Sequence, residues 1–201
     1  MEIYQSDLEE ERDFLSEIFY SDCKNYHAWS YRLWFVERFQ LLDAEELAFV
    51  EEELEDQVTN NSLWSYRYFL LNKTREFSKE LVSEELVYAG KKLEKELSNE
   101  AAWVYLRGWL ACSEAEEKRS KVGSNAKKML ITEFPELKEQ MHKLLAASDL
   151  NKGNRFIYYV LIDFAKAEGD RETAVKYLSL LKVIDRLREN YYQWQLNNLN
   201  A

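Results

Sequence analysis

A spaced pair of residues, Asn followed four positions later by Trp, occurs three times and constrains the fold of this chain more than any other feature. The pairs are Asn25 and Trp29, Asn60 and Trp64, and Asn99 and Trp103, so the Trp residues are 35 and 39 positions apart. Two positions after each Trp comes a Tyr, namely Tyr31, Tyr66 and Tyr105. A period of this length with two helices in each unit is typical of an α-solenoid, in which helical hairpins stack on their neighbours.

Apolar residues recur at three- and four-residue spacings along almost the whole chain, which indicates amphipathic helices. The 201 residues include 5 Gly and 1 Pro, too few for a turn-rich sandwich or barrel. We therefore predict an all-α fold, an α–α superhelix of antiparallel hairpins similar to tetratricopeptide repeats. A single domain is expected over residues 1–201, with clear repeats in 7–112 and a divergent helical part in 125–201.

Capping signals and the apolar period predict the positions of the individual helices. Asp43 and Glu46 have the spacing of a capping box, and Pro135 is expected to end one helix and begin another. Helices are expected over about 6–20, 26–40, 43–57, 61–71, 80–97, 100–115, 135–147, 155–168 and 171–199.

The net charge excludes some classes of partner. It is −10, from 27 basic and 37 acidic side chains, so neither nucleic acid nor an anionic membrane surface is predicted as a partner. A local basic pocket for one anionic ligand remains possible. No apolar run approaches the ~18 residues of a membrane span, and the acidic N-terminus has no apolar signal core. Cys23 and Cys112 make no disulfide framework, so we predict a cytoplasmic protein.

Packing explains most of each repeat. The Asn supplies an N-cap acceptor, and the Trp one turn further belongs to an apolar core stripe. Arg32 follows Trp29 by three positions and is expected to stack on it or to pair with an acidic neighbour. The third copy departs from this pattern, with Leu106 in place of the Arg. The residues predicted to be structural are Trp29, Arg32, Trp64, Arg67 and Trp103.

The pattern Asn-x-x-x-Trp-x-x-Arg, repeated on helical hairpins, resembles the α subunit of the protein prenyltransferases. The resemblance is closest to the α subunit shared by protein farnesyltransferase and geranylgeranyltransferase type I. Residues 24–32, 60–69 and 99–103 carry it, and it extends over about 7–110. Beyond this range the similarity is weak, although residues 188–194 are similar to the end of that family.

This resemblance implies one half of a heterodimeric enzyme. The partner would be a β subunit, an α–α barrel that carries the zinc, the lipid pocket and most contacts to the protein substrate. The reaction would transfer a farnesyl or geranylgeranyl group from its diphosphate to the cysteine thiol of a C-terminal CaaX sequence, with magnesium required. No metal site is expected on this chain, because its two His and two Cys form no close cluster. The isolated chain is expected to be inactive.

The resemblance also implies a site. Tyr26 and His27 occupy the positions at the mouth of the pocket near the isoprenoid diphosphate, with Lys24 and Asn25 beside them. Negative charge builds on the diphosphate as the thiolate displaces it, and hydroxyl, imidazole or ammonium donors at a helix N-terminus can stabilise that charge. The alternatives are a solvated Lys24, a capping Asn25, a packed Tyr26 and a structural His27.

The α subunits of that family are longer, with further repeats before this region, and one of those repeats holds a lysine that contacts the diphosphate. That repeat is expected to be absent here. The chain would then be a fragment, a shortened subunit or a relative that has lost the activity. Missing repeats would expose an apolar edge and favour a partner.

Two other functions fit the sequence. A non-catalytic scaffold is the main alternative, because Ala165, Gly169, Ala174 and Tyr177 resemble a tetratricopeptide unit, and solenoids bind peptides or helices. A subunit of the enzyme that modifies Rab proteins ranks lower, because residues 60–62 fit the farnesyl type better. A prenyltransferase subunit should expose its Tyr-His pair beside a basic pocket, whereas a scaffold has no reason to do so.

Overall fold

The computed structural model describes residues 5–111, 129–147 and 154–200, and these residues contain helices and no strand. The first helices are α1 (Gln5–Ser21), α2 (Tyr26–Arg38), α3 (Ala44–Asp56) and α4 (Asn61–Thr74). The later elements are α5 (Lys79–Lys95), α6 (Glu100–Ala111), α8 (Met129–Thr132), α9 (Pro135–Ala147), α10 (Arg155–Glu168), α11 (Arg171–Ile184), the 3₁₀ turn η3 (Arg186–Arg188) and α12 (Glu189–Asn200). The prediction of an all-α fold is confirmed, and Pro135 begins a helix as expected.

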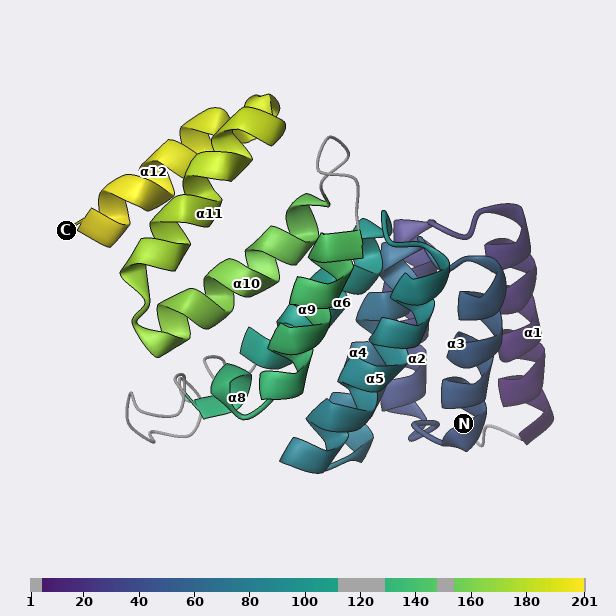
Figure 1. The fold of residues 1–201 in the computed structure, drawn as a ribbon. Coiled ribbons are helices and arrows are strands. Elements are labelled where there is room, and N and C mark those ends of the chain that lie inside the picture. The colour runs from purple at the N-terminus through teal and green to yellow at the C-terminus, as the bar shows by residue number, and fades with distance from the viewer. Residues whose placement is uncertain (1–4, 112–128, 148–153, 201) are drawn as a thin grey trace. The chain divides into compact units, whose positions relative to one another are not determined.

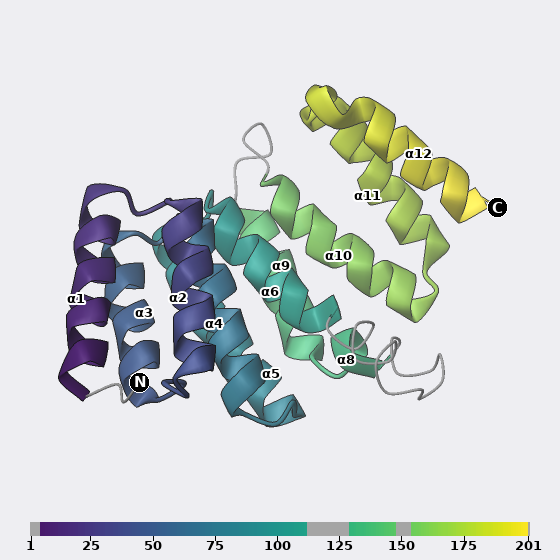
Figure 2. The same cartoon turned by 180° about the vertical axis from the view of Figure 1, so that it is seen from behind.

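The chain divides into two compact units, residues 1–78 and 79–201, which are described separately. In the first unit, α1 and α2 form one antiparallel hairpin and α3 and α4 form the next (Figures 1 and 2). The buried apolar side chains of this unit are Leu15, Phe19, Ala28, Trp29, Phe35, Val36, Val50, Leu54, Leu63, Trp64, Tyr66, Leu70 and Leu71. The assignment of residues 1–201 to a single domain stays a prediction.

The turns inside three hairpins share one construction. They are residues 22–25, 57–60 and 96–99, and each ends at the Asn of the repeat. That Asn accepts a backbone N–H of the following helix, which satisfies a donor that has no partner inside the helix. The Trp four positions later donates its indole N–H to the second carbonyl of the turn. These bonds join Trp29 to Cys23, Trp64 to Val58 and Trp103 to Leu97, at 2.9, 2.7 and 2.9 Å.

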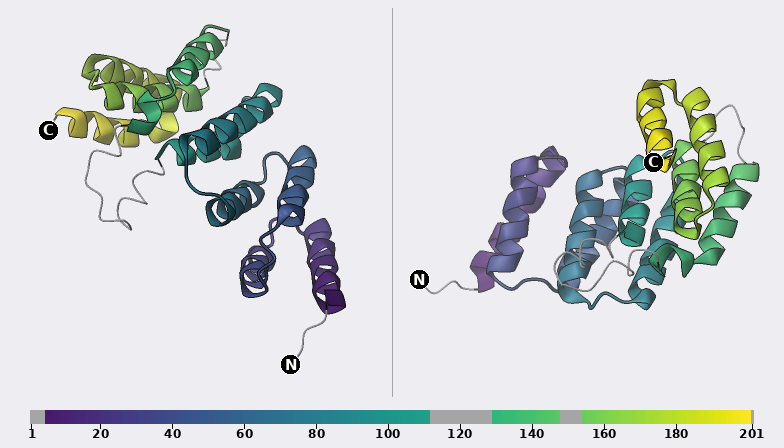
Figure 3. Two further views of the ribbon diagram at one scale, coloured as in Figure 1. Left: turned by 90° about the horizontal axis from the view of Figure 1, so that it is seen from below. Right: turned by 90° about the vertical axis from the view of Figure 1, so that its left-hand side faces the viewer.

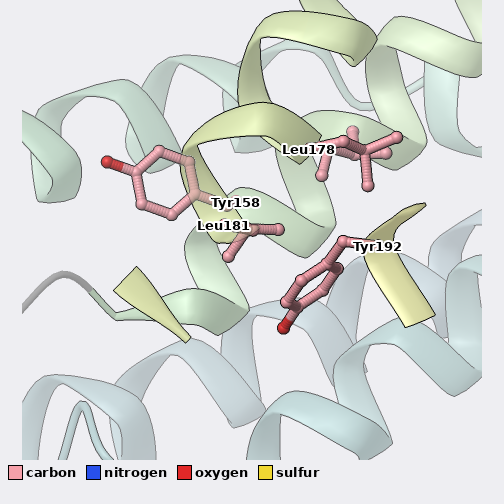
Figure 4. Packing of buried hydrophobic residues seen from close by; sticks show 5 residues of the cluster. Tyr158, Leu178, Leu181 and Tyr192 are labelled. Atoms are coloured by element: carbon pink, nitrogen blue, oxygen red, sulfur yellow. The ribbon is translucent and has the colours of Figure 1, made fainter. Parts of the chain in front are cut away.

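In the second unit α10, α11 and α12 lie side by side (Figure 3). Tyr158 of α10, Leu178 and Leu181 of α11 and Tyr192 of α12 form the core of this group (Figure 4). α10 ends at Gly169, which adopts a left-handed conformation with φ +74° that L side chains rarely adopt. The predicted separation of α10 from α11 at this position is confirmed.

The prediction of one helix over residues 171–199 is wrong, because the helix breaks at Asp185. The carboxylate of Asp185 accepts the hydroxyl of Tyr192 at 2.7 Å and pairs with Arg188 at 3.1 Å. These bonds favour a chain reversal, which places Tyr192 against Leu181 instead of continuing the helix into solvent. The apolar period continues across the break, so the period gives no sign of it.

Candidate functional site

The turn of residues 22–25 carries the predicted site. Its backbone closes with a bond from the N–H of Asn25 to the carbonyl of Asp22 at 3.1 Å, and the Asp22 carboxylate accepts the N–H of Lys24 at 3.2 Å. Asn25 caps α2 by accepting the N–H of Ala28 at 3.1 Å. The capping role of Asn25 is therefore confirmed, while its contact with a ligand stays a prediction.

Two side chains from elsewhere in the unit hold this turn at Cys23. Its carbonyl oxygen accepts the indole N–H of Trp29 at 2.9 Å and the side-chain amide of Asn60, also at 2.9 Å. Trp29 is itself buried and stacks on Phe19 with ring centroids 4.2 Å apart. A residue of the second repeat thus fixes the turn of the first repeat. The position of the site is therefore not set only by the few hydrogen bonds within the turn itself.

Tyr26 and His27 emerge from this fixed turn into solvent. Tyr26 is 76% exposed, and His27 is exposed as well. Their rings contact each other edge to face, with centroids 5.6 Å apart. Tyr26 is therefore not packed in the core of this unit. Contact of either residue with a diphosphate stays a prediction.

A buried ionic network lies between the first two hairpins. Glu46 is 1% exposed and accepts two bonds from Arg32, at 3.0 and 3.1 Å. The hydroxyl of Tyr66 donates to the same carboxylate at 2.7 Å, and Arg12 lies 3.2 Å away. Burial, and then the charge of Glu46, raise the pKa of the Tyr66 hydroxyl far above its usual value. This network joins α1, α2, α3 and α4, so it stabilises the stacking of the two repeats.

The network also settles two expectations from the sequence. Arg32 pairs with an acidic residue, as one alternative proposed, and its guanidinium lies over Phe49, 3.7 Å from the ring centroid, rather than stacking on Trp29. Asp43 caps α3 as expected, accepting the N–H of Glu46 at 3.1 Å. The second half of the predicted capping box is not formed, because the Glu46 side chain turns inward to Arg32.

The sequence reasoning missed the acidic partners of the repeated Tyr residues. Tyr105 donates to the buried Glu85 at 2.5 Å, as Tyr66 does to Glu46. In both pairs the Glu precedes the Tyr by 20 positions, and this shared spacing is the signal that could have found them. Arg67, the counterpart of Arg32, is also buried and pairs with Glu51 at 3.0 Å.

A fourth copy of the repeat was also missed. Asn154 caps α10 by accepting the N–H of Phe156 at 3.0 Å, and its amide donates to the carbonyl of Leu97. This second bond repeats the one from Asn60 to Cys23. Tyr158, fully buried, occupies the position of the Trp. The aromatic substitution hid the copy, although an Asn four positions before a large aromatic residue was present in the sequence.

The described residues contain no group of three or more His, Cys, Asp or Glu side chains arranged to hold a metal ion. Across the same residues, no helix has the length and apolar character needed to cross a bilayer. Cys112 lies outside the described residues.

Comparisons with known proteins agree with this geometry. The family described as "Protein prenyltransferase alpha subunit repeat" matches residues 8–39 and 43–74, which correspond to the two hairpins of the first unit. Solved structures give 21 matching chains, whereas the curated protein sequences give no match. One matching chain is from Candida albicans protein geranylgeranyltransferase-I complexed with GGPP, with a TM-score of 0.74 and 30% sequence identity. The match covers 96% of this chain and 59% of that chain.

The fold and the repeated turns define the fold class of this protein. It is an α–α superhelix of helical hairpins, as predicted. More particularly, residues 8–39 and 43–74 match the repeat of the protein prenyltransferase alpha subunits, and the predicted resemblance is confirmed. The third and fourth Asn lie outside the two matched ranges, but both cap the helix that follows, and Trp103 of the third copy also forms the turn bond.

Proposed function

We propose that this chain is the α subunit of a heterodimeric, cytoplasmic protein prenyltransferase. The complex would transfer a farnesyl or geranylgeranyl group from its diphosphate to a C-terminal CaaX cysteine. The observation that carries the proposal is the turn at Cys23, fixed by Trp29 and Asn60, which exposes Tyr26 and His27 together. The family repeats support it, as does the similarity to an enzyme chain solved with GGPP.

The proposed chemistry assigns this chain the stabilisation of the leaving group. The Tyr26 hydroxyl, the His27 imidazole and the Lys24 ammonium would donate to the diphosphate as negative charge develops on it. Asn25 would keep the N-terminus of α2 capped, so that these donors stay in place without reorganisation during the reaction. Zinc held by the β subunit would bind the substrate cysteine in its thiolate form, and magnesium would neutralise charge on the diphosphate.

Reconstitution with a partner tests this proposal. The chain would be co-expressed with the zinc-bearing β subunit of its own source organism, and a one-to-one complex would be sought by size-exclusion chromatography with light scattering. Transfer to a CaaX peptide would be measured with labelled farnesyl diphosphate and geranylgeranyl diphosphate in parallel. Each subunit alone serves as the control, and the ratio of the two rates gives the lipid preference.

The outcomes separate the parts of the proposal. An active one-to-one complex supports it and shows that upstream repeats are dispensable. A complex without transfer supports the pairing but contradicts the catalytic role of this chain as it stands. Failure to form a complex contradicts the proposal and favours the scaffold.

The scaffold remains the second candidate because of the hairpin of α10 and α11. Ala165 and Ala174 are both fully buried there, which allows the close helix packing that is typical of tetratricopeptide units. A scaffold would bind a peptide without a barrel-shaped partner. It predicts that His27→Ala leaves that peptide's affinity unchanged.

A further inference from the structure

A cavity of about 520 Å³ lies in the second unit, between α6, α10, η3 and α12. It is independent of the turn at Cys23 and belongs to the other compact unit. Figure 2 shows the three α-helices concerned. The charged side chains that line the cavity are Arg107, Arg155, Lys166, Arg188, Glu100 and Asp163. Four are basic and two acidic, which gives the lining a net charge of +2 in a chain whose net charge is −10.

The arginines of the cavity are held in position by carboxylates that leave other donors free. Arg107 uses its Nε to bind Asp163 at 2.8 Å, and Arg155 uses one terminal nitrogen to bind Glu100 at 3.0 Å. Arg188 binds Asp185 through one terminal nitrogen at 3.1 Å. A guanidinium has five donors in a planar fork, so each arginine keeps donors for a ligand.

Among the four basic side chains that line the cavity, Lys166 has the least compensation of its positive charge by carboxylates. It donates to the amide oxygen of Gln195 at 2.7 Å and forms no ion pair within the described residues. Partial burial lowers the pKa of its ammonium group, the charge of Asp163 opposes this effect, and Arg107 adds to it. An anion bound beside Lys166 would supply the charge partner that it lacks.

Two aromatic side chains, Tyr159 and Tyr191, line the cavity together with Ile162 and Gln195. The proton of the Tyr192 hydroxyl goes to Asp185, so Tyr159 donates its own proton to the Tyr192 oxygen at 2.6 Å. Arg107 lies over the Tyr159 ring, 5.3 Å from its centroid. Tyr191 lines the cavity and is about half exposed. These rings offer flat apolar surfaces beside the cations.

We propose that this cavity binds a phosphate monoester whose organic group is planar or apolar. The phosphate would contact Lys166 and the free donors of Arg107 and Arg155, and the organic group would lie on Tyr159 and Tyr191. A phosphate ester is strongly anionic at neutral pH, and the lining keeps a net charge of +1 when Asp185, the partner of Arg188, is included. The oxygens of the ester also suit the arginine fork. A cavity of this volume is in the range of small-molecule sites and is far larger than a single phosphate requires.

Binding of phenyl phosphate to the full chain tests the proposal. Chemical shifts of backbone amides and arginine Nε–H groups would be followed by NMR during separate titrations with phenyl phosphate, inorganic phosphate and benzoate. We expect saturable shifts centred on Tyr159, Lys166 and Arg107, tightest for phenyl phosphate and weakest for benzoate. Tighter binding of phenyl phosphate supports the proposal, whereas equally tight binding of inorganic phosphate would overturn it, because the organic group would then contribute nothing.

A pair of variants localises the binding. Lys166→Gln should weaken phenyl phosphate binding about tenfold, because it removes a charge-assisted hydrogen bond. Lys176→Gln is the control, because it removes the same charge from an exposed position on α11. Within the described residues Lys176 has no hydrogen bond or ion pair, so this substitution should leave the affinity for phenyl phosphate unchanged. Circular dichroism checks that both variants are folded. Absence of saturable shifts, equal effects of the two substitutions, or benzoate binding as tight as that of phenyl phosphate would each overturn the proposal.

Discussion

The side-chain amide of Asn60 donates to the backbone carbonyl of Cys23 at 2.9 Å, across 37 positions of sequence. The same oxygen accepts the indole N–H of Trp29. A residue of the second repeat therefore fixes the turn of the first, and Tyr26 and His27 follow that turn directly. Asn154 forms the equivalent bond to Leu97 in the second unit, so the bond is a feature of the repeat rather than an accident of one turn.

Substitution of Asn60 by Asp separates capping from this bond. The carboxylate keeps the acceptor that caps α4 but can donate neither to Cys23 nor to the side-chain oxygen of Gln57. We expect Asn60→Asp to lower the free energy of unfolding by about 2–3 kcal/mol, because a donor is lost and a carboxylate is buried near a carbonyl. Urea denaturation followed by circular dichroism measures the change.

Asn25→Asp is the matched control for that substitution. Asn25 also caps a helix, but within the described residues its side-chain amide donates to no other group. The control should change the free energy of unfolding by less than about 0.5 kcal/mol. Equal losses in the two variants would show that the bond to Cys23 contributes nothing.

Removal of the Glu46 charge should be among the most destabilising substitutions in the first unit. Glu46→Gln leaves Arg32 buried without its counterion, and breaking a buried pair in this way costs about 3 kcal/mol or more. Glu45→Gln, one position earlier, breaks only an exposed contact to Arg12 and should cost less than about 0.5 kcal/mol. The urea denaturation midpoints of Glu46→Gln and Glu45→Gln would be compared. Similar midpoints for the two variants would contradict the structural role of Glu46.

Tyr66 should give the stability a dependence on alkaline pH. Burial and the charge of Glu46 raise the pKa of its hydroxyl in the folded state, whereas the unfolded chain has a pKa of about 10. The contribution of Tyr66 is therefore fully present below about pH 10 and is lost as the pH rises toward the folded-state pKa. Thermal unfolding of the wild type and Tyr66→Phe from pH 8 to 11 should show a constant difference that shrinks above about pH 10. A difference that stays constant to pH 11 would contradict the raised pKa.

His27→Ala tests the proposed leaving-group contact in the reconstituted heterodimer. We expect turnover to fall about three- to tenfold, the effect of one exposed hydrogen-bond donor, with the melting temperature unchanged because His27 is exposed. Tyr20→Ala is the control, since Tyr20 is 96% exposed and lies on α1 outside the turn. Unchanged turnover in His27→Ala, or the same loss in both variants, would remove His27 from the proposed site.

Much of the fold could be predicted from local sequence. The starts of α2, α4 and α10 follow an Asn cap, and the apolar period extends over single helices, so both signals lie within a dozen residues. The exposed position of Tyr26 and His27 was also expected, although through the family resemblance rather than from their chemistry.

The sequence by itself determined the helical class, the repeat and the position of most helix ends, because caps and periodicity act between near neighbours. Tertiary structure decided the rest. Glu46 turned from its expected cap to Arg32, Asp185 broke a helix to bind Tyr192, and the Cys23 carbonyl accepted the side-chain amide of Asn60 from 37 positions away. In each case a polar group found a partner that only the packing of helices brings near, and a buried polar group without a partner is costly enough to outweigh local preference.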